Sequence, residues 1–396
     1  MISVDEAKQY IQQYTQTGPT VVVDLYEACG YAIAKDVFSP VDFPSFRQSA
    51  MDGYAFRLDD VDGDAVFVVE REIQAGTIDE ISSIKKGEAI RIFTGAKVPD
   101  DADTIVIQEH VEINGNNIRI TNIELTKGSN IRPVASQTRQ GDCILKKGTL
   151  ITPGAAGLLA SVGISIIDVV AKPRCTILNT GRELVKPGND VQQGQIYESN
   201  SYALVAALKK LQLDVCEIMW VDDDEQQTIA AIQTALEKTD VLLITGGVSV
   251  GDYDFVESAL AKNGVAKIFH KVKQKPGKPL YFGTKENSII FGLPGNPGSV
   301  LTCFYEYVVP CLQLKMGIAK HGLLTLQLPL SHDISKKAGL THFLKGTITS
   351  TGVAVLNHQE SYKMNAFADA DCLIVVDEQM TNMQQGDLVN VHILAF

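Results

Sequence analysis

The sequence predicts a multidomain fold that combines a doubly wound α/β domain with smaller β lobes. The chain has 396 residues, which is too long for one compact core. Between residues 174 and 317, strand-like and helix-like runs alternate, and such repeated units form a parallel sheet covered on both faces. Short β-rich runs separated by Gly, Asn, Asp and Pro occupy the segments before and after this region, which is typical of β lobes.

Composition narrows the classes of partner. The formal net charge is −12, which argues against a general nucleic-acid or anionic-membrane binder, because such proteins need a basic face. No apolar run reaches the length of a membrane-spanning helix, and the N-terminus lacks the pattern of a secretory signal. The seven cysteines are scattered without a C-x-x-C pair, so we expect reduced thiols in a cytoplasmic protein.

The first third of the chain predicts a helix and an inserted lobe. Ser3 and Glu6 have the spacing of a capping box, and Ala7 and Ile11 follow at helical spacing. Residues 42–133 carry short β-rich runs and predict a separate lobe. The chain then returns through residues 141–163, which we expect to pack beside the first helix.

The α/β region and the tail complete a four-domain organisation. We expect its strands at residues 176–178, 215–219, 241–244 and 288–291. From about residue 323, strand-like runs predict a small barrel or sandwich, of which we favour the barrel. The predicted domains are an N-terminal α+β domain (1–41 and 134–171), an inserted β lobe (42–133), an α/β domain (172–320) and a C-terminal β-barrel (321–396).

The most informative segment covers residues 240–254, DVLLITGGVSVGDYD. A buried strand ends in Thr245-Gly246-Gly247, and Gly251 is followed by the acids Asp252 and Asp254. In an open α/β sheet, ligands bind at the carboxyl ends of the strands. Glycines there let the backbone approach a phosphate or an oxyanion, and carboxylates favour a divalent cation. The segment therefore predicts a phosphorylated ligand together with Mg²⁺.

Three other segments place polar groups at predicted strand ends. They are Asn179-Thr180-Gly181-Arg182-Glu183, Asp222-Asp223-Asp224, and residues 292–299 with Gly295 and Gly298. The last segment opens a helix, whose N-terminus suits an anion, and its glycines would keep the approach clear. Because successive strand ends of a parallel sheet lie on one edge, we expect these segments to line one cleft.

Charged residues suggest what that cleft binds. Lys275-Pro276-Gly277-Lys278-Pro279 holds two lysines in a loop stiffened by proline, where they would suit a phosphate and an oxyanion. Glu183, Asp222 and Asp254 are candidates to hold Mg²⁺ or to orient its waters. Each feature alone has an ordinary explanation, as a solvated helix start, a surface charge or a tight turn. Their joint occurrence at the strand ends of one sheet favours a ligand site.

Six motifs occur in order along the chain: SAMDGYA (49–55), FTGA (93–96), GQIYESN (194–200), TGGVSVGDYD (245–254), KPGKP (275–279) and GLPGNP (292–297). In content, order and spacing they closely resemble the molybdopterin molybdenumtransferase family, which includes MoeA and the E domain of gephyrin. The resemblance covers essentially the whole chain. It implies an elongated homodimer of four-domain subunits with a cleft shared between subunits, and a molybdopterin-binding α/β domain.

The resemblance also implies a reaction. Adenylylated molybdopterin and molybdate would be the substrates, the metal would enter the dithiolene, and AMP would leave with the help of Mg²⁺. A molybdopterin adenylyltransferase is the implied partner, and neither nucleic acid nor a membrane is expected.

Site residues follow from the same motifs. The implied catalytic residues are Asp52 and Thr94, which would face the α/β cleft of the partner subunit, and Glu183, Asp222, Asp254, Lys275 and Lys278. The acids Glu183, Asp222 and Asp254 form the implied metal set. The implied binding residues are Thr180, Gly181, Gly246, Gly247, Ser249, Gly251, Pro294, Gly295, Asn296, Pro297 and Ser361.

The chain departs from the family pattern at several positions. Gln137 stands where an acid is expected, Arg47-Gln48 where many members carry Asp-Asn, Lys345 where arginine is common, and Glu360 where glycine is usual. Because most of the acidic and basic set survives, we expect an active enzyme. The alternative is a catalytically weak molybdopterin-binding scaffold or carrier. A nucleotide-transferring enzyme of the same α/β superfamily is a third interpretation, and the 49–55 motif argues against it.

Overall fold

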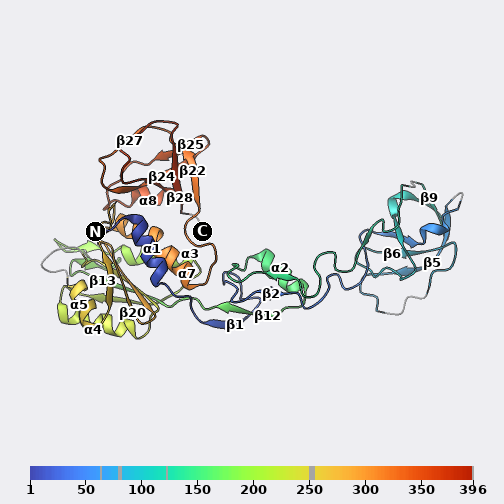
Figure 1. The fold of residues 1–396 in the computed structure, drawn as a ribbon, viewed down its shortest axis with the longest axis horizontal. Coiled ribbons are helices and arrows are strands. Elements are labelled where there is room, and N and C mark those ends of the chain that lie inside the picture. The colour runs from blue at the N-terminus through green and yellow to red at the C-terminus, as the bar shows by residue number, and fades with distance from the viewer. Residues whose placement is uncertain (63–64, 79–82, 122–123, 249–254, 395–396) are drawn as a thin grey trace.

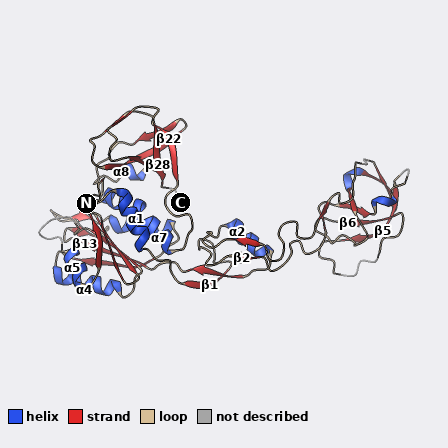
Figure 2. Cartoon of the chain, viewed as in Figure 1, coloured by secondary structure: helices blue, strands red, loops and turns tan. Residues whose placement is uncertain are grey.

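The chain folds into an extended arrangement of four parts (Figure 1). The structure is a computed structural model that describes residues 1–62, 65–78, 83–121, 124–248 and 255–394. The α/β part and the C-terminal β part lie together at one end, a small module lies in the middle, and a β lobe lies at the far end. Figure 2 shows that most helices gather in the α/β part, whereas strands occur in all four parts. Among the described residues, no helix combines the length and the apolar character needed to cross a membrane.

A six-stranded sheet forms the centre of the α/β part, in the order β16-β13-β17-β21-β20-β18. Four neighbouring strands run parallel, namely β16 (Val215–Val221), β13 (Cys175–Thr180), β17 (Val241–Thr245) and β21 (Ser288–Leu293). They contain the four predicted strands, so the predicted parallel sheet is confirmed here. The strands β20 (Tyr281–Lys285) and β18 (Ala266–His270) add an antiparallel edge. The two-residue turn Glu286-Asn287 joins β20 to β21, and so short a connection allows only an antiparallel pair.

Helices cover both faces of this sheet, as a doubly wound fold requires. One face carries α4 (Glu225–Leu236) and α5 (Val256–Lys262), whose buried side chains include Ile232 and Leu260. The other face carries α1 (Val4–Tyr14), α3 (Asn200–Lys210), α6 (Pro297–Cys303) and α7 (Val309–Lys315). Figure 1 shows these two groups on opposite sides of the sheet.

The first helix has its predicted cap but not its predicted packing. Ser3 Oγ accepts the Glu6 N–H at 3.2 Å and Glu6 Oε2 accepts the Ser3 N–H at 2.7 Å, so the capping box is confirmed. Ala7 and Ile11 are buried in the α/β core, where α1 contacts α7. Residues 141–163 do not pack beside this helix, because their apolar side chains are buried within the middle module.

Two segments that are far apart in the sequence form the middle module. The strand β1 (Thr20–Asp24) pairs with β12 (Ile166–Val170), and β2 (Val37–Phe38) pairs with β11 (Cys143–Leu145). The helix α2 (Pro153–Ser161) contributes Ala155 and Leu159 to the same apolar cluster. The chain therefore leaves the module after β2 and re-enters it at β11, and the residues between them form the distal lobe.

The distal lobe is built on a six-stranded sheet in the order β7-β4-β6-β5-β9-β8. Its strands are β4 (Gly53–Phe56), β5 (Val66–Ile73), β6 (Glu88–Ile92), β7 (Thr104–Ile107), β8 (Val111–Asn114) and β9 (Asn117–Ile120). The short strands β3 (Gln48–Ser49) and β10 (Ile131–Arg132) pair where the chain enters and leaves the lobe. Two 3₁₀ helices, Leu58–Asp60 and Gln108–His110, complete it.

The C-terminal part closes into a small barrel, as predicted. Its main strands are β22 (Thr325–Pro329), β24 (Thr341–Thr349), β25 (Gly352–Val355), β26 (Cys372–Val376) and β28 (Leu388–Ile393). They are hydrogen-bonded in the order β25-β24-β26-β28-β22, and a bridge between Leu330 and Val353 joins the two ends. The strand β23 (Ile334–Ser335) pairs with β27 (Asn382–Met383), and α8 (Asn365–Ala368) is a single short helix.

A buried carboxylate ties α1, the segment between α6 and α7, and β28 of the barrel together. Glu306 lies in a π-helical turn, Phe304–Val308, between α6 and α7, and its side chain is only 1% exposed. It contacts Lys8 Nζ of α1 at 2.7 Å and His392 Nδ1 of β28 at 2.6 Å. Burial by itself would raise the pKa of the Glu306 carboxyl, but the charges and hydrogen bonds of Lys8 and His392 outweigh burial and hold that pKa below its usual value.

Replacing this carboxylate tests its structural role. We expect Glu306→Gln to lower the free energy of unfolding at pH 7 by on the order of 3 kcal/mol, because it breaks a buried ion pair. Because the pKa of Glu306 is lower in the folded state, its carboxylate contributes fully to stability above about pH 4.5, the usual glutamate value. This contribution is lost as the pH falls through the lower folded-state pKa. Urea unfolding of both proteins from pH 7 down to pH 3 should therefore show the difference shrinking on acidification.

A second ion pair between the α/β and C-terminal parts provides the matched control. Lys273 Nζ and Glu378 Oε1 lie 3.1 Å apart, with both side chains partly exposed. Glu378→Gln should cost less than about 1 kcal/mol, because exposed ion pairs contribute little. Equal losses for the two variants would contradict the special role of Glu306.

Candidate active site

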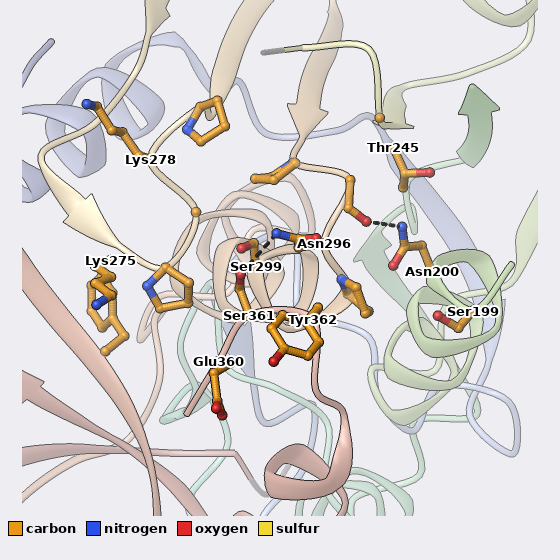
Figure 3. Close-up of a pocket in the computed structure, with 18 of the residues that line it drawn as sticks. Ser199, Asn200, Thr245, Lys275, Lys278, Asn296, Ser299, Glu360, Ser361 and Tyr362 are labelled. Carbon is orange, nitrogen blue, oxygen red and sulfur yellow. Dashed lines mark hydrogen bonds between the residues drawn. The ribbon is translucent and has the colours of Figure 1, made fainter. Parts of the chain in front are cut away.

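A cavity of about 1090 Å³ lies between the carboxyl ends of the α/β sheet and the C-terminal barrel. The sheet contributes the residues that follow β13, β17 and β21, and the barrel contributes β24 residues and residues 359–362. Figure 3 shows Lys275 and Lys278 on one side of the cavity and Asn200 and Thr245 on the other. Three of the four predicted strand-end segments therefore meet at this cavity, whereas the prediction was wrong for residues 222–224, which do not line it.

Buried hydrogen bonds fix the ends of β13 and β17. Thr245 Oγ1 donates to Asn179 Oδ1 at 2.8 Å, and Thr180 Oγ1 donates to the Thr245 carbonyl at 3.2 Å. Gly246 follows with φ of 82°, and a Cβ there would lie 2.8 Å from the Thr180 carbonyl oxygen. Only glycine fits this close approach without strain, and its backbone is left facing the cavity.

The turn before α6 is held against the barrel. Asn296 Nδ2 donates to Ser361 Oγ at 3.0 Å, and the Gly298 N–H donates to the Ser361 carbonyl at 2.8 Å. A Cβ on Gly298 would lie 2.9 Å from that carbonyl oxygen, so Gly298 is needed for barrel contact and not, as expected, to clear a ligand's approach. A Cβ on Gly295 would meet only the Gly246 Cα, at 4.0 Å, so its role in clearing a ligand's approach stays a prediction. Pro294, Pro297 and Ser361 also line the cavity.

Asn200 is a cavity residue whose role the sequence did not single out. It is buried at the start of α3, and its Nδ2 donates to the Gly295 carbonyl at 2.9 Å. Its Oδ1 is buried and makes no hydrogen bond to the described residues. An unpaired buried acceptor is costly unless a ligand or water donates to it. The GQIYESN motif, which ends at Asn200, was the available signal.

The two lysines of the loop provide the positive charge of the cavity. Lys275 and Lys278 are exposed and have no ion-pair partner within the described ranges. Lys275 pairs in register with His342 where β19 (Gln274–Lys275) runs parallel to β24. Burial, and then the charges of Lys336 and Lys275, lower the pKa of His342 below its usual value of 6.5. His342 is therefore a neutral cavity residue at pH 7.

The acids divide between two pockets. Glu183 lines the main cavity and an adjoining pocket of about 310 Å³, which Asp223, Gly181, Gly246 and Gly247 also line. Asp222 is exposed and does not line either pocket, and Asp224 instead caps α4 by accepting the Gln227 N–H at 2.8 Å. Asp223, which follows the predicted Asp222 in the sequence, is thus the aspartate of this run that lines the smaller pocket.

Three predicted residues, Ser249, Gly251 and Asp254, lie outside the described residues. Within the described part of the chain, no group of three or more His, Cys, Asp or Glu side chains is arranged to hold a metal ion. The predicted metal set of Glu183, Asp222 and Asp254 therefore stays a prediction.

Asp52 and Thr94 form a pair in the distal lobe. Asp52 Oδ1 accepts the Thr94 N–H and the Thr94 hydroxyl, both at 2.7 Å. These hydrogen bonds, the backbone one first, lower the pKa of Asp52. The lobe that carries the pair lies at the opposite end of the chain from the cavity (Figure 1), so the two do not meet within one chain.

The positions that depart from the family pattern have structural partners. Arg47 donates to the carbonyls of Pro99 and Ala102, and Gln137 donates to Ser161 Oγ at 3.3 Å. Lys345 is fully buried, its Nζ donates to the Gln359 carbonyl at 2.9 Å, and burial lowers its pKa to about 8. Glu360 lines the cavity and pairs with Lys363 at 2.9 Å.

Comparisons with known proteins agree along the whole chain. Three family models match it. The model of the MoeA N-terminal region (domain I and II) matches residues 2–163, and the model of a probable molybdopterin binding domain matches residues 176–314. The model of the MoeA C-terminal region (domain IV) matches residues 327–394. A molybdopterin molybdenumtransferase from Haemophilus influenzae is 34% identical, with 99% of this chain and 98% of that protein covered. One from Staphylococcus aureus is 31% identical, with 98% and 95% covered. A crystal structure of the molybdopterin biosynthesis MoeA protein from Pyrococcus horikoshii matches with a TM-score of 0.85 at 26% identity, covering 99% of this chain and all of that one.

The pKa of His342 reports on the cavity's charge. Lys275→Ala removes a positive charge beside the imidazole, so we expect the His342 pKa to rise, as measured by NMR titration of the ring. Lys278→Ala is the matched control, because Lys278 is not among the charges that lower this pKa. An unchanged His342 pKa in Lys275→Ala would show that Lys275 does not point toward this histidine.

Proposed function

The chain belongs to the molybdopterin molybdenumtransferase family and is a transferase of molybdenum cofactor biosynthesis, and we propose that it inserts molybdate into adenylylated molybdopterin with release of AMP. The observation that carries this proposal is one cavity that holds a glycine turn at the carboxyl ends of parallel strands and two lysines with no ion-pair partner among the described residues. Both substrates are anions, and such a site neutralises and orients anionic groups.

The two sides of the cavity suit different parts of the substrate. Lys275 and Lys278 would neutralise molybdate and the phosphate of the departing AMP. Across the cavity, Asn200 Oδ1 would accept an N–H of the ligand, which satisfies its unpaired oxygen. The remaining parts of the substrate would contact the backbones of Gly246 and Gly247, the residues Thr180 and Gly181, and the turn formed by Pro294, Gly295, Asn296 and Pro297. Ser361 would contact the substrate from the barrel side of the cavity.

Magnesium fits the smaller pocket better than the exposed Asp222 position. Glu183 and Asp223 line this pocket, and neither carboxylate has a hydrogen-bond or ion-pair partner among the residues the structure describes. Unpaired carboxylates are the ligands that Mg²⁺ prefers. We therefore assign Glu183 and Asp223 to the cation, with Asp254 as a further candidate. When bound, Mg²⁺ would neutralise charge on phosphoryl oxygens and ease the departure of AMP.

A homodimer would bring the distal pair to the cavity. Asp52 and Thr94 are joined by two short hydrogen bonds, yet their lobe lies at the far end of their own chain. In a two-fold dimer every contact between the subunits occurs twice. If the distal lobe of one subunit lies against the cavity of its partner, the partner's distal lobe lies against the cavity of the first subunit, and each site is completed by the other chain. We assign Asp52 and Thr94 to the site of the partner subunit.

The setting of the reaction follows from its substrate. Adenylylated molybdopterin must come from an adenylyl-transferring enzyme, so a molybdopterin adenylyltransferase is the expected partner. The seven cysteines are free, four of them are buried, and no disulfide forms among the described residues, which suits the reducing cytoplasm. The competing proposal, a scaffold or carrier, predicts tight binding of adenylylated molybdopterin without turnover.

The reaction is tested by AMP release from adenylylated molybdopterin, with and without molybdate and Mg²⁺. We expect release to require Mg²⁺ and to respond to molybdate, and Lys275→Ala to lower kcat/KM about a hundredfold. Asp223→Asn should raise the Mg²⁺ concentration needed by about tenfold, whereas its neighbour variant Asp222→Asn should not. Tight binding by the wild type without any AMP release would favour the scaffold, and equal effects of the two asparagine variants would remove Asp223 from the metal site.

The shared site is tested by mixing inactive subunits. A heterodimer of Asp52→Ala and Lys275→Ala subunits contains one intact site if Asp52 serves the partner's cavity, so about half of the wild-type activity should return. The control heterodimer, Lys275→Ala with Lys278→Ala, leaves each site one lysine short and should stay inactive. No recovery in the first heterodimer would contradict the shared site.

A further inference from the structure

The side chain of Gln274 is buried directly beneath the loop that carries both lysines. Gln274 is only 1% exposed, and its Nε2 donates to the carbonyls of Pro276 at 3.0 Å and Gly277 at 3.2 Å. These two carbonyls lie between Lys275 and Lys278 in the sequence, so holding them fixes where both lysines leave the backbone. The amide also contacts Cys303 Sγ at 3.5 Å, which ties it to α6.

Gly277 makes this close contact sterically acceptable. Its φ is 84°, and a Cβ there would lie 2.5 Å from Cys303 Sγ and 2.9 Å from Gln274 Nε2. The loop can therefore rest on the Gln274 amide and on α6 only because residue 277 has no side chain.

The orientation of Gln274 is set from below by Tyr307. The Tyr307 hydroxyl donates to Gln274 Oε1, and Tyr307 is fully buried in the π-helical turn. Burial is the main reason that the pKa of Tyr307 lies well above the usual tyrosine value, so the hydroxyl stays protonated and remains a donor. Because Oε1 accepts from Tyr307, the NH₂ end of the amide must face the loop carbonyls.

We propose that Gln274, oriented by Tyr307, is the positioning residue that presents Lys275 and Lys278 to anionic ligands. The inference rests on the proposed function, because it assigns the anion-binding role to these lysines. Neither Gln274 nor Tyr307 needs to touch the anion. They act by holding the loop backbone, so that less ordering is required when the ligand binds.

The experiment removes one hydroxyl and measures anion binding. Tyr307→Phe keeps the ring and deletes the bond to Gln274, and isothermal titration with AMP and with inorganic molybdate should show about fivefold weaker binding. Tyr305→Phe is the matched control, because it deletes a hydroxyl two residues away in the same π-helical turn, where the ring packs against Phe367 of the barrel instead. That control should bind both anions like the wild type, even if the two variants lose similar amounts of thermal stability.

A second variant and a double-mutant cycle separate positioning from general stability. Gln274→Met, which has similar volume but no hydrogen bonds, should weaken anion binding at least as much as Tyr307→Phe. In a Lys275→Ala background, Tyr307→Phe should weaken binding less than it does in the wild type, because the part of its effect that passes through Lys275 is already lost. A merely structural role would instead give the same loss in both backgrounds.

The outcomes distinguish this inference from the function on which it rests. If the wild type binds both anions and releases AMP, while Tyr307→Phe and Tyr305→Phe bind alike, the positioning role is overturned and the proposed function stands. Additive effects in the cycle would overturn it as well. If the wild type neither binds these anions nor releases AMP, the proposed function fails and the inference fails with it.

Discussion

The cavity depends on the C-terminal barrel being held against the edge of the α/β sheet. Two short backbone contacts do this: β19 pairs in parallel with β24, and the Gly298 N–H donates to the Ser361 carbonyl. Backbone hydrogen bonds fix position more tightly than contacts between long side chains, because they leave no rotamer freedom. The first contact places the lysine loop and the second places residues 359–362, so both walls of the cavity are set by the same docking.

The π-helical turn links this docking to the core. Its consecutive residues reach different neighbours. Tyr305 stacks on Phe367 of the barrel, Glu306 contacts both Lys8 and His392, and Tyr307 donates to Gln274. Such turns are rare and occur often at functional sites. Here one turn holds the N-terminal helix, the barrel and the lysine loop in a single arrangement, so the site's geometry is tied to the relative position of the parts around it.

The sequence predicted what depends on local pattern and missed what depends on distant packing. Runs of apolar residues identified the parallel strands, and Gly246 was identifiable because a strand end needs a close backbone approach. Which of Asp222 and Asp223 lines the smaller pocket depends on how the chain leaves β16, which spacing does not encode. Gln274 gave no signal, because a glutamine beside lysines and prolines looks like an ordinary loop residue. Only the fold shows that α6 and Tyr307 bury it.

Electrostatics explains how so few residues could define the proposed anion site on this protein. The chain carries a formal net charge of −12, so its average surface repels molybdate and phosphorylated ligands. Lys275 and Lys278 are exposed, have no carboxylate partner among the described residues, and line one wall of the cavity, where they supply positive charge. The preference for an anion at this cavity would therefore come from a small, positively charged region held in a fixed position on a protein whose surface is otherwise acidic. Moving the loop by even a small distance would weaken that preference, which is why the buried residues beneath it matter as much as the lysines themselves.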